Sequence, residues 1–326
     1  MSRPAIAAGL LLVLTGTILS LGVGRIWLPP SVLVESIVAP HPTLAWLILS
    51  ELRLPRTLLG LMVGASLGLS GAVLQGLLRN PLAEPGLLGV SAGASLGAVI
   101  AIYFGLSTAF ALSTPLLGII GALTAGLLTI AIGRGGTLVL ILAGSAVSGL
   151  AAAGLSLALN FAPSPYAAYE ITTWLLGSLA DRDWQQLALA TPFMLTGWIC
   201  LAVTGRALDA LTLGEAQAAS LGVNLGRTRF LALAGTALAV GAATAVTGAI
   251  GFIGLVAPHL VRPFVGYEPR RVLLPSALFG AVLLLAADIA TRLIPTTQEL
   301  KLGVLTSLFG APFFFWLILR LRRLAP

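Results

Sequence analysis

The residues of this chain that could do chemistry are few and scattered. Its two histidines, His41 and His259, lie far apart, and its single cysteine, Cys200, lies within an apolar run. No acidic cluster or second cysteine accompanies them, so we expect no metal site. No Gly-x-Ser-x-Gly sequence stands in an α/β context, which a serine–histidine–aspartate hydrolase would need. A membrane-embedded enzyme is therefore disfavoured.

One pair of charged residues has a spacing that suggests contact. Asp288 and Arg292 are four residues apart and so share a face of an apolar helix. An ionisable residue at membrane depth is by default a functional candidate. Near a helix end, mutual neutralisation of Asp288 and Arg292 is the simpler interpretation. No other acid lies deep in an apolar segment, and this scarcity counts against coupling to protons or sodium ions.

The single lysine, Lys301, excludes another chemistry. It lies in Glu299-Leu300-Lys301-Leu302, whereas a P-loop places its lysine directly after a glycine to reach nucleotide phosphates. The chain therefore lacks a Walker A site, and any ATP and Mg²⁺ would be bound by a separate ATPase subunit. We expect this chain to bind no cofactor.

The composition shows which elements must position these residues. Of the 326 residues, 58% are hydrophobic and only 9% are charged, against about 25% in soluble domains. We therefore predict an all-α polytopic membrane protein, with 1–326 as a single transmembrane domain. The net charge of +7 comes without a basic run interleaved with aromatics, so nucleic acid is not an expected partner.

Nine clear apolar spans and one short one are visible. They cover 5–24, 57–78, 87–104, 111–133, 138–160, 187–204, 230–249, 272–293 and 303–319, and the short segment is Gly251–Val261. With ten crossings and a cytoplasmic N-terminus, most of the 18 basic residues lie on the cytoplasmic side, whereas nine crossings place most of them outside. The positive-inside rule thus favours ten transmembrane helices with both termini cytoplasmic. We expect the first span to be an uncleaved helix rather than a signal peptide.

The same topology orients the three longest connections. Segments 25–56 and 163–186 face outward, and 205–229 faces the cytoplasm. Ser70-Gly71-Ala72-Val73 before Pro81 resembles Thr247-Gly248-Ala249-Ile250 before Pro258, an offset of five spans. Such an offset predicts an inverted repeat, with halves at about 50–160 and 228–323, which is typical of transporters. Chance similarity between Gly/Ala-rich helices is the alternative.

Glycines recur at helical spacing in two spans. Gly60, Gly64 and Gly68 form one i, i+4, i+8 series, and Gly89, Gly93 and Gly97 form the other. In lipid, where apolar burial contributes little, small residues let helix backbones approach closely. We therefore predict helix packing along both stripes, in preference to a pore-lining role.

Two stretches carry a specific resemblance. The first runs from Arg53-Leu54-Pro55-Arg56 through Gly71–Gln75 to Arg79-Asn80-Pro81-Leu82-Ala83-Glu84-Pro85-Gly86-Leu87-Leu88-Gly89. The second runs from Gly251-Phe252-Ile253-Gly254-Leu255-Val256-Ala257-Pro258-His259 through Ala287-Asp288 to Gly310-Ala311-Pro312-Phe313. Over nearly its whole length the chain resembles the permease family of ABC importers for ferric siderophores, haem and cobalamin. The resemblance implies a type II importer permease.

The resemblance also implies roles for individual residues. Arg53, Arg56 and Arg292 match outward-facing arginines that receive glutamates of a binding protein, with anchoring of the second span as the alternative for Arg53 and Arg56. Asn80, Leu82 and Thr137 match positions of a cytoplasmic gate. Segment 205–229 resembles the loop that couples to the ATPase, and its contact positions would be Gly214, Glu215, Ala218, Leu221 and Gly222. Its composition predicts a short helix that stops at Gly222.

The resemblance implies partners as well. They are a second copy of the permease in a homodimer, two ATP-binding cassette subunits and a periplasmic binding protein, in the inner (plasma) membrane of a bacterium. Such a permease would be a transport subunit and not an enzyme. The main alternative is an ion-coupled secondary transporter of a small solute. A non-transporting scaffold is disfavoured by the repeat.

Overall fold

A computed structural model describes residues 3–24, 26–38, 43–295 and 299–324, which form helices and connecting turns without a β-strand. The long helices are α1 (Arg3–Gly22), α4 (Leu54–Leu77), α7 (Ser113–Ile132), α8 (Thr137–Asn160), α10 (Trp184–Ala202), α13 (Leu225–Thr247), α15 (Pro269–Leu293) and α16 (Leu302–Leu324). The shorter ones are α2 (Pro30–Val38), α3 (Leu44–Leu47), α5 (Val90–Tyr103), α6 (Leu106–Ala109), α9 (Pro165–Leu175), α11 (Gly205–Leu211), α12 (Glu215–Ser220) and α14 (Ile253–Val265). The all-α prediction is confirmed.

Several helices are long and apolar enough to cross a membrane. Within the described residues seven pass this test, and α10 with α11, bent by 42°, would be an eighth. Helices α5 and α14 have 14 and 13 residues, so each rises about 20 Å and falls short of the roughly 30 Å hydrocarbon core. Of the expected span 87–104, helix α5 thus covers only Val90–Tyr103. The chain is a multi-pass membrane protein, and ten crossings stay a prediction.

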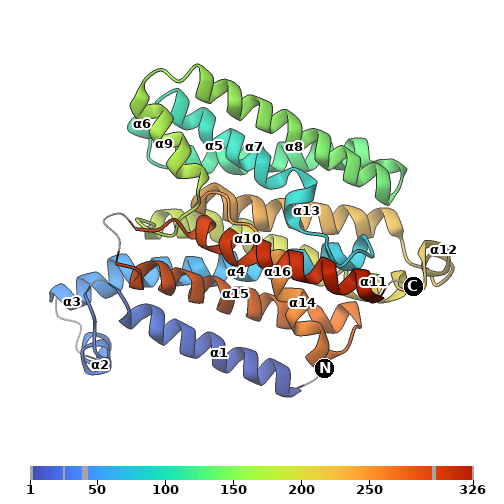
Figure 1. Ribbon diagram of the computed structural model, residues 1–326, viewed down its shortest axis with the longest axis horizontal. Helices are drawn as coiled ribbons and strands as arrows, with labels where there is room; N and C mark the ends of the chain where they lie inside the picture. Colours follow the sequence, from blue (N-terminus) through green and yellow to red (C-terminus); the bar gives the residue numbers. More distant parts are fainter. Residues whose placement is uncertain (1–2, 25, 39–42, 296–298, 325–326) are drawn as a thin grey trace.

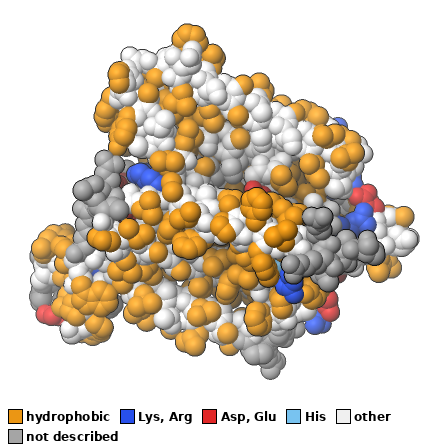
Figure 2. All heavy atoms as spheres, in the orientation of Figure 1, with side chains coloured by type: hydrophobic (Ala, Val, Ile, Leu, Met, Phe, Trp, Pro, Cys, Tyr) orange, Lys and Arg blue, Asp and Glu red, His pale blue; other side chains and the backbone are white. Residues whose placement is uncertain are grey.

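The helices run along a common direction in a layered bundle. Helices α5, α7 and α8 lie on one side, α1 lies on the opposite side, and α4, α13 and α15 lie between (Figure 1). The face seen in Figure 2 is largely apolar along the helices, and most of its visible charged side chains lie toward the two ends. An apolar flank is the surface that hydrocarbon requires.

Small residues let the central helices touch backbone to backbone. A Cβ added at Gly64 would overlap the carbonyl oxygen of Gly280, and one at Gly68 would overlap that of Ser276. Helix α4 therefore meets α15 at very close range. At Gly60 an added Cβ would meet only leucine methyl groups, at 3.2 Å. The structure thus places Gly64 and Gly68, more than Gly60, at the tightest part of this interface.

The second glycine series lies between α5 and α7. A Cβ at Gly97 would overlap the carbonyl oxygen of Leu117, and one at Gly93 would overlap Ala125. Gly89 is different, and its assignment to the same helical stripe is wrong. It precedes α5 as the N-cap, with a left-handed φ of 75°, and its neighbours are Val147 and Gly144 of α8. The i+4 spacing could not show that the helix begins one residue later.

In each of the two predicted halves, the first long helix packs on two helices of the other half. In the first half α4 packs on α14 and α15, and in the second half α13 packs on α5 and α7. Within the halves, α5 packs on α7 and α14 packs on α15. Helices α5 and α14 are also preceded by left-handed N-cap residues, Gly89 and Phe252, with φ of 75° and 66°. This correspondence supports an internal repeat, and its inverted orientation stays a prediction.

Candidate functional site

The residues singled out above lie at opposite ends of the bundle. Helix α1 begins and α16 ends at the end that carries α12, whereas α3 lies at the other end (Figure 1). We call these the α12 end and the α3 end. Arg53, Arg56 and Arg292 lie at the α3 end, and Asn80, Thr137 and Glu215 lie at the α12 end.

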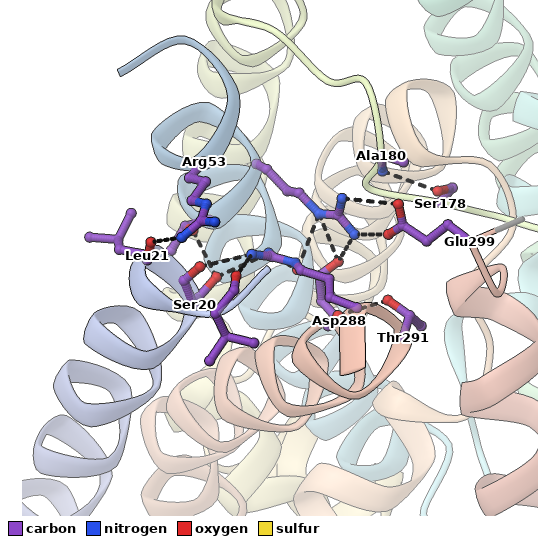
Figure 3. Close-up of polar contacts among 12 residues, drawn as sticks. Ser20, Leu21, Arg53, Ser178, Ala180, Asp288, Thr291 and Glu299 are labelled. Atoms are coloured by element: carbon purple, nitrogen blue, oxygen red, sulfur yellow. Dashed lines mark hydrogen bonds and ion pairs between the residues drawn. The ribbon is translucent and has the colours of Figure 1, made fainter. Parts of the chain in front are cut away.

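A buried carboxylate organises the α3 end (Figure 3). Asp288 is fully buried, and its Oδ1 accepts hydrogen bonds from Arg56 Nη2 at 2.8 Å and Nε at 3.0 Å. Its Oδ2 pairs with Arg292, so the predicted neutralisation of Asp288 by Arg292 is confirmed. Arg56 also pairs with Glu299, which precedes α16. The cluster therefore joins the starts of α4 and α16 to the end of α15.

The other arginine contacts bind the end of α1. Arg53 is only 7% exposed, and its Nη1 donates to the carbonyls of Leu21 at 2.6 Å and Gly22 at 2.7 Å. Arg292 Nη1 donates to Ser20 O at 2.8 Å. The last carbonyls of a helix have no N–H donors within the helix. Here the guanidinium groups of Arg53 and Arg292 donate to them. In this structure Arg53 is almost fully buried and holds the end of α1.

A cavity of about 460 Å³ lies beside this cluster. Its wall includes Arg53, Arg56, Arg292 and Glu299, with Leu52 among its apolar residues. Arg56 keeps 14% and Glu299 keeps 29% of its side chain exposed, compared with 6% for Arg292. Of the three predicted docking arginines, Arg56 is the most accessible.

The turn after α4 is held by its own polar groups. Asn80 Oδ1 accepts from the backbone N–H of Leu82 at 2.9 Å, which closes an Asx turn, and Pro81 cannot continue the helix. Before the turn, Gln75 Oε1 accepts from Arg262 Nη2 of α14 at 2.6 Å. The sequence interpretation missed Gln75, although an amide inside an apolar helix marks a polar contact.

A short helix projects at the α12 end, as predicted for segment 205–229. Helix α12 ends at Ser220, and Gly222, two residues later, has a φ of 85°. Gly222 N donates to Ala219 O at 2.9 Å, and Val223 N donates to Ala218 O at 3.0 Å. This is a Schellman motif, so the expected stop is confirmed. Ala218 is buried, whereas Leu221 is 65% exposed.

Contacts connect α12 to its surroundings. Glu215 pairs with Arg229 of α13 at 2.7 Å, and Thr137 Oγ1 lies 3.5 Å from Glu215 Oε1. A Cβ at Gly214 would lie 4.0 Å from Arg79 Nη1, so the turn after α4 is beside this helix. Thr137, assigned to the gate, thus contacts the helix assigned to ATPase coupling.

A model of a known transport family matches residues 11–320 of the 326 residues. The chain belongs to the FecCD transport family. This FecCD protein is 42% identical over 317 residues to the vitamin B12 import system permease BtuC of Salmonella arizonae, covering 96% of this chain and 93% of that one. It is 39% identical over 283 residues to the hemin transport system permease HmuU of Yersinia pestis, covering 85% and 84%.

A solved structure extends the likeness to three dimensions. A chain described as a metal-chelate type ABC transporter in an inward-facing conformation superposes with a TM-score of 0.84 and 33% identity, covering 98% of this chain and 99% of that one. PsaBC from Streptococcus pneumoniae shares the fold alone, with a TM-score of 0.55 and 17% identity. The bundle of this FecCD protein is therefore the fold of an ABC transporter permease.

Proposed function

We propose that this FecCD protein is the membrane permease of an ATP-driven importer for a metal chelate, namely a ferric siderophore, haem or cobalamin. The observation that carries the proposal is the family match over residues 11–320, together with relatives that import vitamin B12 and hemin. ATP hydrolysis belongs to separate cassette subunits, because this chain has no P-loop. The full assembly contains two permease copies, two cassettes and a periplasmic binding protein in a bacterial inner membrane.

The α3 end is the proposed docking face for the binding protein. Arg56 and Arg292 border a cavity of about 460 Å³ that a partner's carboxylates can enter. Charge pairs across such a surface raise the association rate and orient the complex. Arg53 stabilises this surface by donating hydrogen bonds to the carbonyls at the end of α1. With this end periplasmic, both chain termini are cytoplasmic.

The α12 end is the proposed site of coupling and gating. The exposed leucines Leu213 and Leu221 flank α12 and offer an apolar contact to a cassette subunit. Motion of α12 reaches the turn at Asn80 and Leu82 through the proximity of Gly214 and Arg79, and it reaches α8 through Thr137. Alternate opening of the α3 end and the α12 end then moves the cargo across the membrane without covalent chemistry.

Substitution of Leu221 tests this function. We expect Leu221→Arg to weaken cassette binding by at least about tenfold, because a charge replaces an apolar side chain at the contact. Leu221 is a sharper probe than Glu215, whose carboxylate already pairs with Arg229. The measurement is co-purification of the cassette subunit, followed by ATP-dependent uptake of each radiolabelled chelate in proteoliposomes.

The matched control is Leu221→Met, which keeps an apolar side chain and should keep binding. Unchanged co-purification for Leu221→Arg would contradict the coupling role of α12. Uptake by the permease alone, without a cassette subunit, would instead favour the ion-coupled transporter. The buried acid Asp288 is already held by two arginines, which leaves it poorly suited to carry protons.

A second substitution tests docking at the α3 end. Glu299 holds the guanidinium of Arg56, so an incoming carboxylate must compete with it. We expect Glu299→Gln to raise the affinity for the binding protein about threefold to tenfold, with a steeper dependence on salt. Surface plasmon resonance on the reconstituted permease measures this affinity.

Glu51→Gln is the control for Glu299→Gln. Glu51 is an exposed acid at the same end whose side chain accepts from Ser50, 3.5 Å away, and does not contact Arg56. The Glu51→Gln substitution changes the charge of the α3 end by as much as Glu299→Gln does. It should nevertheless leave the affinity for the binding protein within about twofold of the wild type. A loss of affinity on Glu299→Gln would show that Glu299 itself contacts the binding protein.

A further inference from the structure

A groove on the flank of the bundle is apolar along its length and polar at one end, as a phospholipid is. It has a volume of about 530 Å³ and lies between α1, α4, α10 and α15. Its walls are apolar side chains, among them Val13, Met62, Trp198 and Ala277, and its one charged wall residue is Arg270. The groove thus offers hydrocarbon contact along its length and a cation at its α12 end.

The mouth of the groove is polar. A second cavity of about 320 Å³ adjoins it and shares Arg270 and Leu274 with it. The acids at this mouth are already engaged, because Glu268 pairs with Arg271 at 2.7 Å and Asp209 Oδ1 accepts from the backbone N–H of Arg270 at 2.8 Å. Among the described residues no partner contacts the guanidinium of Arg270, which is exposed. The guanidinium of Arg270 therefore keeps its N–H donors free at the polar mouth, beside the carboxylates of Asp209 and Glu268.

The length of the groove identifies the occupant. Arg270 lies in the first turn of α15, and Ala281 is the wall residue of that helix farthest from it, about 16 Å along the axis at 1.5 Å per residue. Half of a hydrocarbon core of about 30 Å is about 15 Å. The groove is thus about as long as one leaflet is thick, whereas a partner's transmembrane helix would need a groove through both leaflets.

We propose that this groove binds an anionic phospholipid of the leaflet at the α12 end, with one acyl chain against α4, α10 and α15 and the phosphate on Arg270. Arginine forms charge-assisted hydrogen bonds with phosphate oxygens, and those bonds select an anionic headgroup. The inference does not depend on the cargo or on the coupling role of α12.

Native mass spectrometry of the purified full chain tests the proposal, with phosphatidylglycerol and phosphatidylcholine as probes. The wild-type chain should retain phosphatidylglycerol in preference to phosphatidylcholine. Arg270→Gln should lower retention of phosphatidylglycerol about tenfold. Ala277→Phe, which fills the apolar part of the groove, should lower retention of both lipids.

Arg134→Gln is the matched control, because Arg134 is an exposed arginine at the same end but lies between α7 and α8, away from the groove. Equal loss for Arg134→Gln and Arg270→Gln would overturn the site in favour of general surface charge. Equal retention of the two lipids by the wild type would contradict the preference for an anionic headgroup. Retention of a polypeptide in place of lipid would contradict the assignment of a phospholipid to the groove. Arg270→Gln changes an exposed side chain, so the test stands even if Ala277→Phe fails to fold.

Discussion

Asp288→Ala is expected to destabilise the folded permease by about 3–5 kcal/mol. The substitution leaves the guanidinium of Arg292, only 6% exposed, without its carboxylate, and it removes one of the two acids that hold Arg56. Loss of one member of a buried ion pair is costly because the remaining charge stays desolvated. Thermal unfolding of the detergent-solubilised protein measures the effect.

Two further variants check that the cause is electrostatic. Glu268→Ala breaks the exposed Glu268–Arg271 pair, whose side chains are 57% and 49% exposed, and should cost less than about 1 kcal/mol. Combining Asp288→Ala with Arg292→Met removes the orphaned charge and should recover part of the loss. Wild-type stability of Asp288→Ala would contradict the structural role of the cluster.

Gly68→Ala is expected to disrupt the α4–α15 interface, at a cost of about 3 kcal/mol and a large fall in folded yield. The added Cβ would overlap the carbonyl oxygen of Ser276, which belongs to a helix backbone and cannot move as a side chain can. Both helices must then separate, and close-packed interiors tolerate such overpacking poorly. Yield by size-exclusion chromatography and thermal unfolding of the purified protein measure the effect.

Gly60→Ala on the same helix is the matched control. There the added Cβ would meet only methyl groups of Leu179 and Leu285 at 3.2 Å, and those side chains can adjust. Alanine also has a helix propensity about 1 kcal/mol more favourable than glycine, so Gly60→Ala should be neutral or slightly stabilising. Equal effects at the two positions would show that backbone contact at Gly68 is not what holds the helices together.

Much of the α12 end could be predicted from local sequence. The helix stop at Gly222 follows from the conformational freedom of glycine, and the composition of 213–223 favours a short helix. These features depend on residues within one or two turns of each other. The contact of Thr137 with Glu215 could not be predicted, because it joins segments 78 residues apart whose meeting depends on how α8 packs.

The sequence by itself determined that the protein is a helical membrane protein of the FecCD family, and that Asp288 would face Arg292. Hydrophobicity, helix periodicity and motif residues are properties of the local chain, so they can be read without coordinates. Only the tertiary structure decided that Arg56, 232 residues from Asp288, completes the buried cluster and that Arg53 caps α1. The physical reason is that a desolvated charge must find a partner wherever helix ends meet, and packing, not spacing along the chain, decides which ends meet.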